Sequence, residues 1–140
     1  MSGVNKYVMI PVLFSLVFGS TTSEVTAASV QERAKQESSQ TIDWKTTAAD
    51  HQRQLDQNFT YRCSPNGSVG GAWGTDTYTY DSSICTAAVH AGLITARNGG
   101  VVTIRIRPGA SSYIGTTRNG VTTAGYGSYT GSFIFINSSR

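Results

Sequence analysis

The chain has little charge: Asp, Glu, Lys and Arg make up 14% of its 140 residues. Its net charge of +3 is too small and too scattered for a nucleic-acid footprint. Low charge together with 15 glycines argues against a disordered polyelectrolyte and indicates a domain rich in strands and turns. No apolar run reaches the roughly 20 residues that are needed to cross a bilayer, so the mature chain is expected to have no transmembrane span.

A secretory signal peptide is expected at residues 1–27. Lys6 gives a weakly positive start, residues 7–18 are nearly all apolar, and Val25-Thr26-Ala27 supplies the small residues that a signal peptidase reads. A membrane anchor is the alternative, but its apolar run would have to be longer. The mature protein is therefore expected to be secreted or periplasmic.

The mature chain divides by composition. Residues 28–57 are rich in polar residues and are expected to form a linker or arm, whose part from residue 42 is either a helix or an extended segment packed on the domain. Residues 58–140 are expected to form the domain. It contains both cysteines, Cys63 and Cys85, and an even count in an exported chain favours a disulfide between them. Two free thiols or a metal pair are the alternatives, although two cysteines without a second pair make a poor zinc site.

Residues 80–94 form a short apolar run whose composition predicts a buried helix. Asp81 or Ser82 can cap its start, and Gly92 suits its end. Alanine stands where surface helices carry charge, so other layers must surround this helix. Alternating apolar residues at 59–63 and 101–107 predict strands, which makes the expected fold class α+β.

The same residues resemble the LCCL domain, a family named after Limulus factor C, cochlin and a lung protein. The resemblance runs from about residue 59 to residue 136. It is carried in order by Trp73-Gly74-Thr75, Tyr80-x-x-Ser83-x-Cys85-x-Ala87-Ala88-Val89-His90-x-Gly92-x-Ile94, Gly99-Gly100-x-Val102, Tyr113, Asn119-Gly120-Val121 and Ser132-Phe133. It implies a central α-helix wrapped by two antiparallel β-sheets. The family usually has four cysteines in two disulfides, so this two-cysteine chain looks like the trimmed form of bacterial members.

No catalytic residue, metal site or cofactor is expected. His90 and Cys85 are five residues apart, about 140° round a helix, and do not share a face. No strained nucleophile turn accompanies Ser82, Asp81 and His90, so a triad is not indicated. Asp76 and Asp81 are the domain's two carboxylates, and Asp81 is better explained as a cap than as half of a glycosidase pair. The residues expected in the structural core are His90, Trp73, Ile84 and Ala88.

Arginine supplies the positive charge of the domain, with six arginines against two aspartates from residue 58 onward. Arg105 and Arg107 stand about 6.6 Å apart on one face of a strand, and Arg118, in the hairpin that follows, is the third candidate. Arginine binds phosphate and carboxylate through two parallel hydrogen bonds, so these residues form the candidate ligand site. The alternative is a solvated sheet face.

The expected function is that of a secreted, non-enzymatic binding module for an anionic lipid or glycan of the cell envelope, such as lipopolysaccharide or lipid head groups. A structural or protein-interaction module without a small ligand, whose partner is an envelope protein, is the alternative. Several aromatic side chains are alternatives as sugar-stacking platforms, although such residues in small sheet proteins are more often packing residues: Trp73, Tyr78, Tyr80, Tyr113, Tyr126 and Tyr129.

Overall fold

The computed structural model describes residues 39–136, which belong to a compact unit that begins at Ser39. The expected signal peptide and residues 28–38 of the expected linker lie outside the described residues. The elements, in chain order, are β1 (Gln40–Ile42), the 3-10 helix η1 (Ala49–His51), β2 (Asn58–Cys63), β3 (Gly74–Thr75), β4 (Thr77–Thr79), α2 (Ile84–His90), β5 (Gly100–Pro108), β6 (Thr117–Arg118), β7 (Val121–Thr122) and β8 (Gly131–Phe135).

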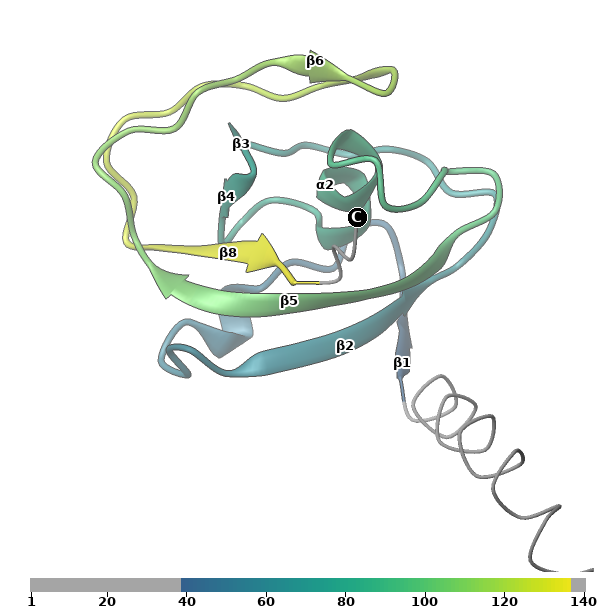
Figure 1. Ribbon diagram of the computed structural model, residues 1–140, viewed down its shortest axis with the longest axis horizontal. Coiled ribbons are helices and arrows are strands. Elements are labelled where there is room, and N and C mark those ends of the chain that lie inside the picture. The colour runs from purple at the N-terminus through teal and green to yellow at the C-terminus, as the bar shows by residue number, and fades with distance from the viewer. Residues whose placement is uncertain (1–38, 137–140) are drawn as a thin grey trace, which may run out of the picture. The chain divides into compact units, whose positions relative to one another are not determined.

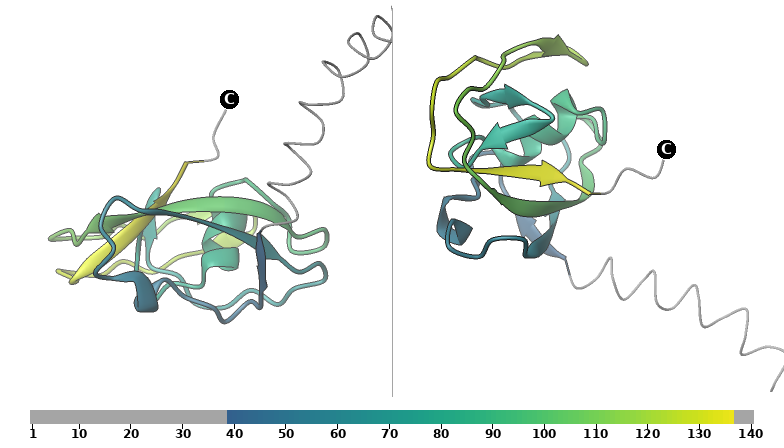
Figure 2. Two further views of the ribbon diagram at one scale, coloured as in Figure 1. Left: turned by 90° about the horizontal axis from the view of Figure 1, so that it is seen from below. Right: turned by 60° about the vertical axis from the view of Figure 1, so that its left-hand side comes forward.

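The helix α2 lies between two sheets. A six-stranded sheet has the order β1-β2-β5-β8-β4-β3, and a two-stranded sheet pairs β6 with β7. Figures 1 and 2 show α2 between the long strand β5 and the β6–β7 hairpin. All seven residues of α2 are buried, as a helix covered on every side requires. The α+β fold predicted for an LCCL domain is therefore confirmed, with β1 parallel to β2 and the remaining strand pairs antiparallel.

Both ends of α2 are closed by specific hydrogen bonds. Ser83 is the N-cap, and its hydroxyl accepts from the Thr86 amide at 3.1 Å while donating to the Trp44 carbonyl at 2.8 Å. The expectation of Asp81 or Ser82 as the cap is therefore wrong by one or two positions. At the other end, Gly92 has a φ of 81° and its amide donates to Val89, while the Leu93 amide donates to Ala88. This is a Schellman motif, in which glycine adopts the left-handed conformation without steric cost.

The long strand β5 separates an apolar inner face from a polar outer face. Val102, Ile104 and Ile106 are fully buried towards α2. The antiparallel register places Phe59 opposite Ile104, and Asn58 opposite Arg105. Opposite residues of paired strands point to the same side of a sheet, so β2 and β5 share both faces.

The arm expected to end at residue 57 contributes directly to this unit. It consists of the strand β1, a loop and the short helix η1, rather than one continuous helix. Ile42, Trp44 and Ala48 lie in the hydrophobic core, and the Trp44 indole donates to the Ser64 carbonyl at 2.9 Å. The described part of the arm therefore packs on the domain through these three residues, whereas residues 52–57 are exposed.

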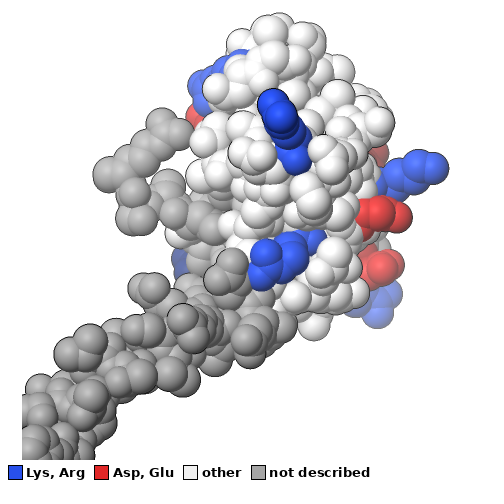
Figure 3. All heavy atoms as spheres, turned by 90° about the vertical axis from the view of Figure 1, so that its right-hand side faces the viewer, with Lys and Arg blue, Asp and Glu red and all other residues white. Residues whose placement is uncertain are grey.

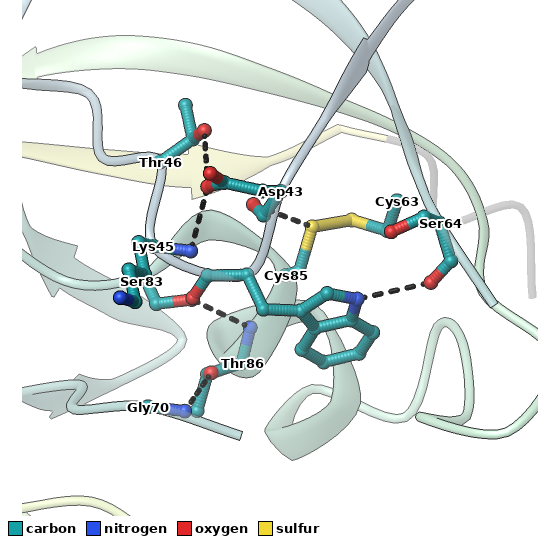
Figure 4. The surroundings of a disulfide bond; sticks show 10 residues. Asp43, Lys45, Thr46, Cys63, Ser64, Gly70, Ser83, Cys85 and Thr86 are labelled. Carbon is teal, nitrogen blue, oxygen red and sulfur yellow. Dashed lines mark hydrogen bonds between the residues drawn. A yellow bond between two sulfur atoms is a disulfide. The ribbon is translucent and has the colours of Figure 1, made fainter. Parts of the chain in front are cut away.

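The helix is covalently tied to the large sheet. Cys63, the last residue of β2, and Cys85, in the first turn of α2, form a disulfide, and both are buried. Figure 4 shows this bond surrounded by Asp43, Ser64, Ser83 and Thr86, which come from the arm, the β2–β3 connection and α2. Three segments distant in sequence thus meet at one covalent link.

Candidate binding site

The outer face of the six-stranded sheet carries the two candidate arginines of β5. Arg105 and Arg107 alternate with Ile104 and Ile106, whose side chains are fully buried on the inner face. The hydroxyls of Thr60 and Thr103 lie 2.9 Å apart in the same pair of strands. The structure thus brings Arg105 and Arg107 together on one polar surface, as their spacing predicts.

Each of these arginines already has a polar partner. The Arg105 Nε atom donates to the Asn58 side-chain oxygen at 2.9 Å, and Arg107 forms an ion pair with Asp56. The side chains of Arg107 and Asp56 are 45% and 67% exposed. An exposed ion pair contributes only about 0–1 kcal/mol, so the Asp56 contact does not prevent Arg107 from binding a stronger anion.

Arg118 does not join the other two arginines. It lies in β6, on the two-stranded sheet, and Figure 1 places that hairpin on the opposite side of α2 from β5. Its guanidinium pairs with Asp76 at 2.9 Å, and Asp76 has a φ of 65° in the turn between β3 and β4. The grouping of Arg118 with Arg105 and Arg107 is therefore wrong, because a hairpin that follows a strand need not return to the same sheet.

A third arginine lies on the outer face, Arg62 of β2, which was not among the predicted site residues. Its register partner is Val101 of β5, four positions along that strand from Arg105, or about 13 Å. Phe59, Tyr61 and Cys63 alternate along β2 and face inward. This pattern in the sequence indicates that Arg62 faces outward. Elsewhere the charge is dispersed: on the face shown in Figure 3, some Lys and Arg side chains stand on uncharged surface and others lie beside Asp or Glu side chains.

His90 is fully buried and its two ring nitrogens both have partners. Nδ1 lies 2.9 Å from the Tyr78 hydroxyl, and Nε2 lies 3.2 Å from the Thr116 carbonyl and 3.1 Å from its hydroxyl. A carbonyl can only accept, so we assign the proton to Nε2, and Tyr78 then donates to Nδ1. Burial lowers the pKa of His90 and raises that of Tyr78 to about 12, so both are neutral near pH 7.

The other residues expected in the core divide into two groups. Ile84 and Ala88 of α2 are fully buried. Trp73 is only half-buried and stands outside the hydrophobic core cluster, so its placement in the core is wrong. The reason is local: the indole lies over Gly71 at the surface, where a Cβ on that glycine would approach it to 3.2 Å.

The model of the LCCL domain family matches residues 42–133 of this chain. The chain belongs to the LCCL domain family. Human vitrin is 36% identical over 87 residues, which cover 60% of this chain and 12% of vitrin. The human cysteine-rich secretory protein LCCL domain-containing 2 is 45% identical over 49 residues, which cover 35% of this chain and 10% of that protein. The chain thus spans about a tenth of the length of these relatives.

Membership of the LCCL family supports a binding module in a general sense. The Cys63–Cys85 disulfide suits an oxidising compartment. Between Ser39 and Ile136 the structure contains no helix long and apolar enough to cross a membrane. The same residues contain no group of three or more histidine, cysteine or acidic side chains arranged to hold a metal ion.

The buried His90 of this LCCL domain predicts a loss of stability in mild acid. Its pKa is lowered in the folded state, so the unfolded chain takes up a proton first as the pH falls below about 6.5. The free energy of unfolding should therefore decrease between about pH 7 and pH 5, by at most about 1.4 kcal/mol per pH unit. Urea unfolding at several pH values measures this slope.

Two variants identify the histidine that causes this pH dependence of the free energy of unfolding. His90→Asn should flatten the pH slope whatever its own stability, whereas His51→Gln, which replaces a half-buried residue of η1, should retain it. Equal slopes in the wild type and His90→Asn would contradict the assignment.

Proposed function

We propose that this LCCL domain is an exported, non-enzymatic module that binds an anionic component of the cell envelope, such as lipopolysaccharide or an anionic lipid head group. The observation that carries the proposal is the outer face of β2 and β5, where Arg62, Arg105 and Arg107 stand on strands that contain no carboxylate. Asp56, which forms an ion pair with Arg107, lies just before β2.

The chemistry of the proposed site follows from its side chains. Arg105 keeps its terminal guanidinium nitrogens available while its Nε atom is held by Asn58. A phosphate can accept from two of these donors at once, which a lysine cannot offer in the same geometry. Binding to such a partly exposed face should weaken with salt, since the Debye length falls from about 10 Å at 0.1 M to about 3 Å at 1 M.

The test is binding of the chain from Ala28 to immobilised lipopolysaccharide and to phosphatidylcholine vesicles with and without phosphatidylglycerol. Arg105→Glu/Arg107→Glu should weaken lipopolysaccharide binding at least about tenfold, equivalent to about 1.4 kcal/mol. It should also abolish the extra binding that phosphatidylglycerol confers. Binding common to both kinds of vesicle does not count towards this result.

The matched control is Arg97→Glu/Arg118→Glu, which changes the net charge by the same amount at two positions outside β5. Arg97 lies in the connection between α2 and β5, and Arg118 in β6. The control should keep most of the binding at about 0.1 M salt. An equal loss in both double variants would reduce the effect to net charge, and a folded wild type that binds neither target would refute the anionic ligand.

A further inference from the structure

Three aromatic side chains and one carboxylate surround a small pocket away from the arginines of β5. The pocket has a volume of about 80 Å³ and is lined by Trp73, Thr79, Asp81, Tyr126 and Tyr129. These residues come from the segment before β3, from β4 and the turn after it, and from the β7–β8 connection. No lysine or arginine is among the lining residues.

The aromatic walls are held in place by the backbone. The Trp73 amide donates to the Ser82 hydroxyl at 2.9 Å, and Trp73 forms a bridge with Ala124. Tyr126 exchanges two backbone hydrogen bonds with Tyr113, of 2.7 and 3.0 Å. Figure 1 shows the β7–β8 connection running beside the β5–β6 connection, which these bonds join. Hydrogen bonds therefore fix the backbone that carries Trp73 and Tyr126.

The carboxylate of Asp81 is fixed at the pocket. The Thr79 hydroxyl donates to it at 2.5 Å, and that hydroxyl is also 3.0 Å from the Ser82 hydroxyl. Burial and the adjacent Asp81 carboxylate raise the pKa of Tyr129, so its phenol remains neutral and able to donate. The pocket thus carries one negative charge among three neutral aromatic rings.

We propose that this pocket binds an alkylated ammonium group, such as the trimethylammonium of choline. Aromatic rings attract cations through the negative charge of their faces, and aromatic cages of this composition suit quaternary ammonium ligands. The Asp81 carboxylate adds charge complementarity. The proposal does not depend on the arginine face, since the two sites share no residue.

A sugar ring fits this site less well than a compact cation does. Recognition of a sugar needs several hydrogen-bonding groups. The Thr79 hydroxyl is already engaged by Asp81 and Ser82, which leaves the Asp81 carboxylate and the Tyr129 phenol for this purpose. A trimethylammonium group has no hydrogen-bonding hydrogen and requires only contact with aromatic faces and a nearby charge. Tyr126, which is 52% exposed, provides the side from which such a group can enter.

The experiment is titration of the chain from Ala28 with choline chloride. Calorimetry and the backbone amide NMR signals of the pocket residues monitor the binding. Sodium chloride at equal ionic strength is the control. Saturable binding that shifts the signals of Trp73 and Tyr126 is expected. The neutral isostere 3,3-dimethylbutan-1-ol has the same shape without the charge and should bind at least about tenfold more weakly. Equal affinity for this alcohol would overturn the proposal.

Variants separate the pocket from its surroundings. Asp81→Asn should weaken choline binding at least about tenfold, and Tyr126→Ala, at an exposed position, several-fold. Asp76→Asn removes an exposed carboxylate outside the pocket and should change nothing, as should Arg105→Glu/Arg107→Glu. Should Asp81→Asn prove unfolded, Tyr126→Ala still decides the question.

Two further outcomes count against the proposal, and one more titration identifies the source of the cation. A folded wild type that shows no saturation with choline up to about 0.1 M would overturn it, and so would binding of a methyl pyranoside at Trp73 in place of choline.

If choline binds, phosphatidylcholine vesicles that compete for the same signals indicate a lipid head group, and vesicles that do not compete indicate a free cation. Loss of lipopolysaccharide binding in Arg105→Glu/Arg107→Glu does not affect choline binding. The failure of one proposal can therefore be distinguished from the failure of the other.

Discussion

Removal of the Cys63–Cys85 disulfide is expected to lower the free energy of unfolding by about 3 kcal/mol. The two cysteines are 22 residues apart, and a bridge that closes a loop of this size restricts the unfolded chain by about that amount. Both residues are fully or nearly fully buried, at 0% and 1% exposure, so the replacement should be alanine, which leaves no buried hydroxyl without a partner.

Urea unfolding of Cys63→Ala/Cys85→Ala, followed by circular dichroism, measures the loss. The wild type in dithiothreitol should approach the stability of the double variant, and the double variant itself should not respond to the reductant. An unchanged unfolding midpoint in both the variant and the reduced protein would show that packing alone holds α2 to β2.

Replacement of Gly131 by alanine is expected to cost about 3 kcal/mol, although it adds a single methyl group. A Cβ at this position would lie 1.7 Å from Cε2 and 2.0 Å from Cζ of Tyr80. Tyr80 is 3% exposed, and its hydroxyl donates to the carbonyls of Gln52 at 3.0 Å and Arg107 at 3.3 Å. The ring must therefore leave its site and lose both bonds, and overpacking of this kind costs about 1–3 kcal/mol before the bonds are counted.

Gly127, four residues earlier in the β7–β8 connection, provides the matched control. A Cβ there would meet no atom within 4 Å, and its φ is not in the left-handed region. Gly127→Ala should change the free energy of unfolding by no more than about 0.5 kcal/mol. Thermal melting of the two variants side by side measures the contrast, and similar melting temperatures would contradict the tight contact between Gly131 and Tyr80.

Features governed by local periodicity were predictable from the sequence. The apolar character of residues 80–94 predicted a covered helix, and the alternation along β5 placed Arg105 and Arg107 on one face. Both predictions rest on a repeat of 3.6 or 2 residues, which the backbone geometry itself imposes. The position of His90 among buried partners follows from the same helical pattern.

Features governed by contacts distant in sequence were not predictable. Asp81, Ser82 and Ser83 are all good caps, and the choice of Ser83 depends on the Trp44 carbonyl, which lies 39 residues earlier. The separation of Arg118 from the β5 arginines depends on which sheet its hairpin joins.

The aromatic pocket is also formed by contacts between residues distant in sequence. Trp73 meets Tyr126 and Tyr129 through a bridge to Ala124, about 50 positions along the chain. No sequence periodicity connects residues so far apart. The sequence therefore predicted a core position for Trp73, which lies at the surface. Such assignments require the tertiary structure.

The seven-residue helix α2 has a consequence for how this domain can fold. Helices shorter than about 12–15 residues are marginal in water, so α2 cannot serve as an early local nucleus. Its formation must wait until strands such as β2 and β5, which begin 42 residues apart, have met and closed a long loop. Domains dominated by such non-local pairing fold in milliseconds to seconds rather than microseconds. The central helix of the finished structure is therefore expected to be among the last elements to become stable.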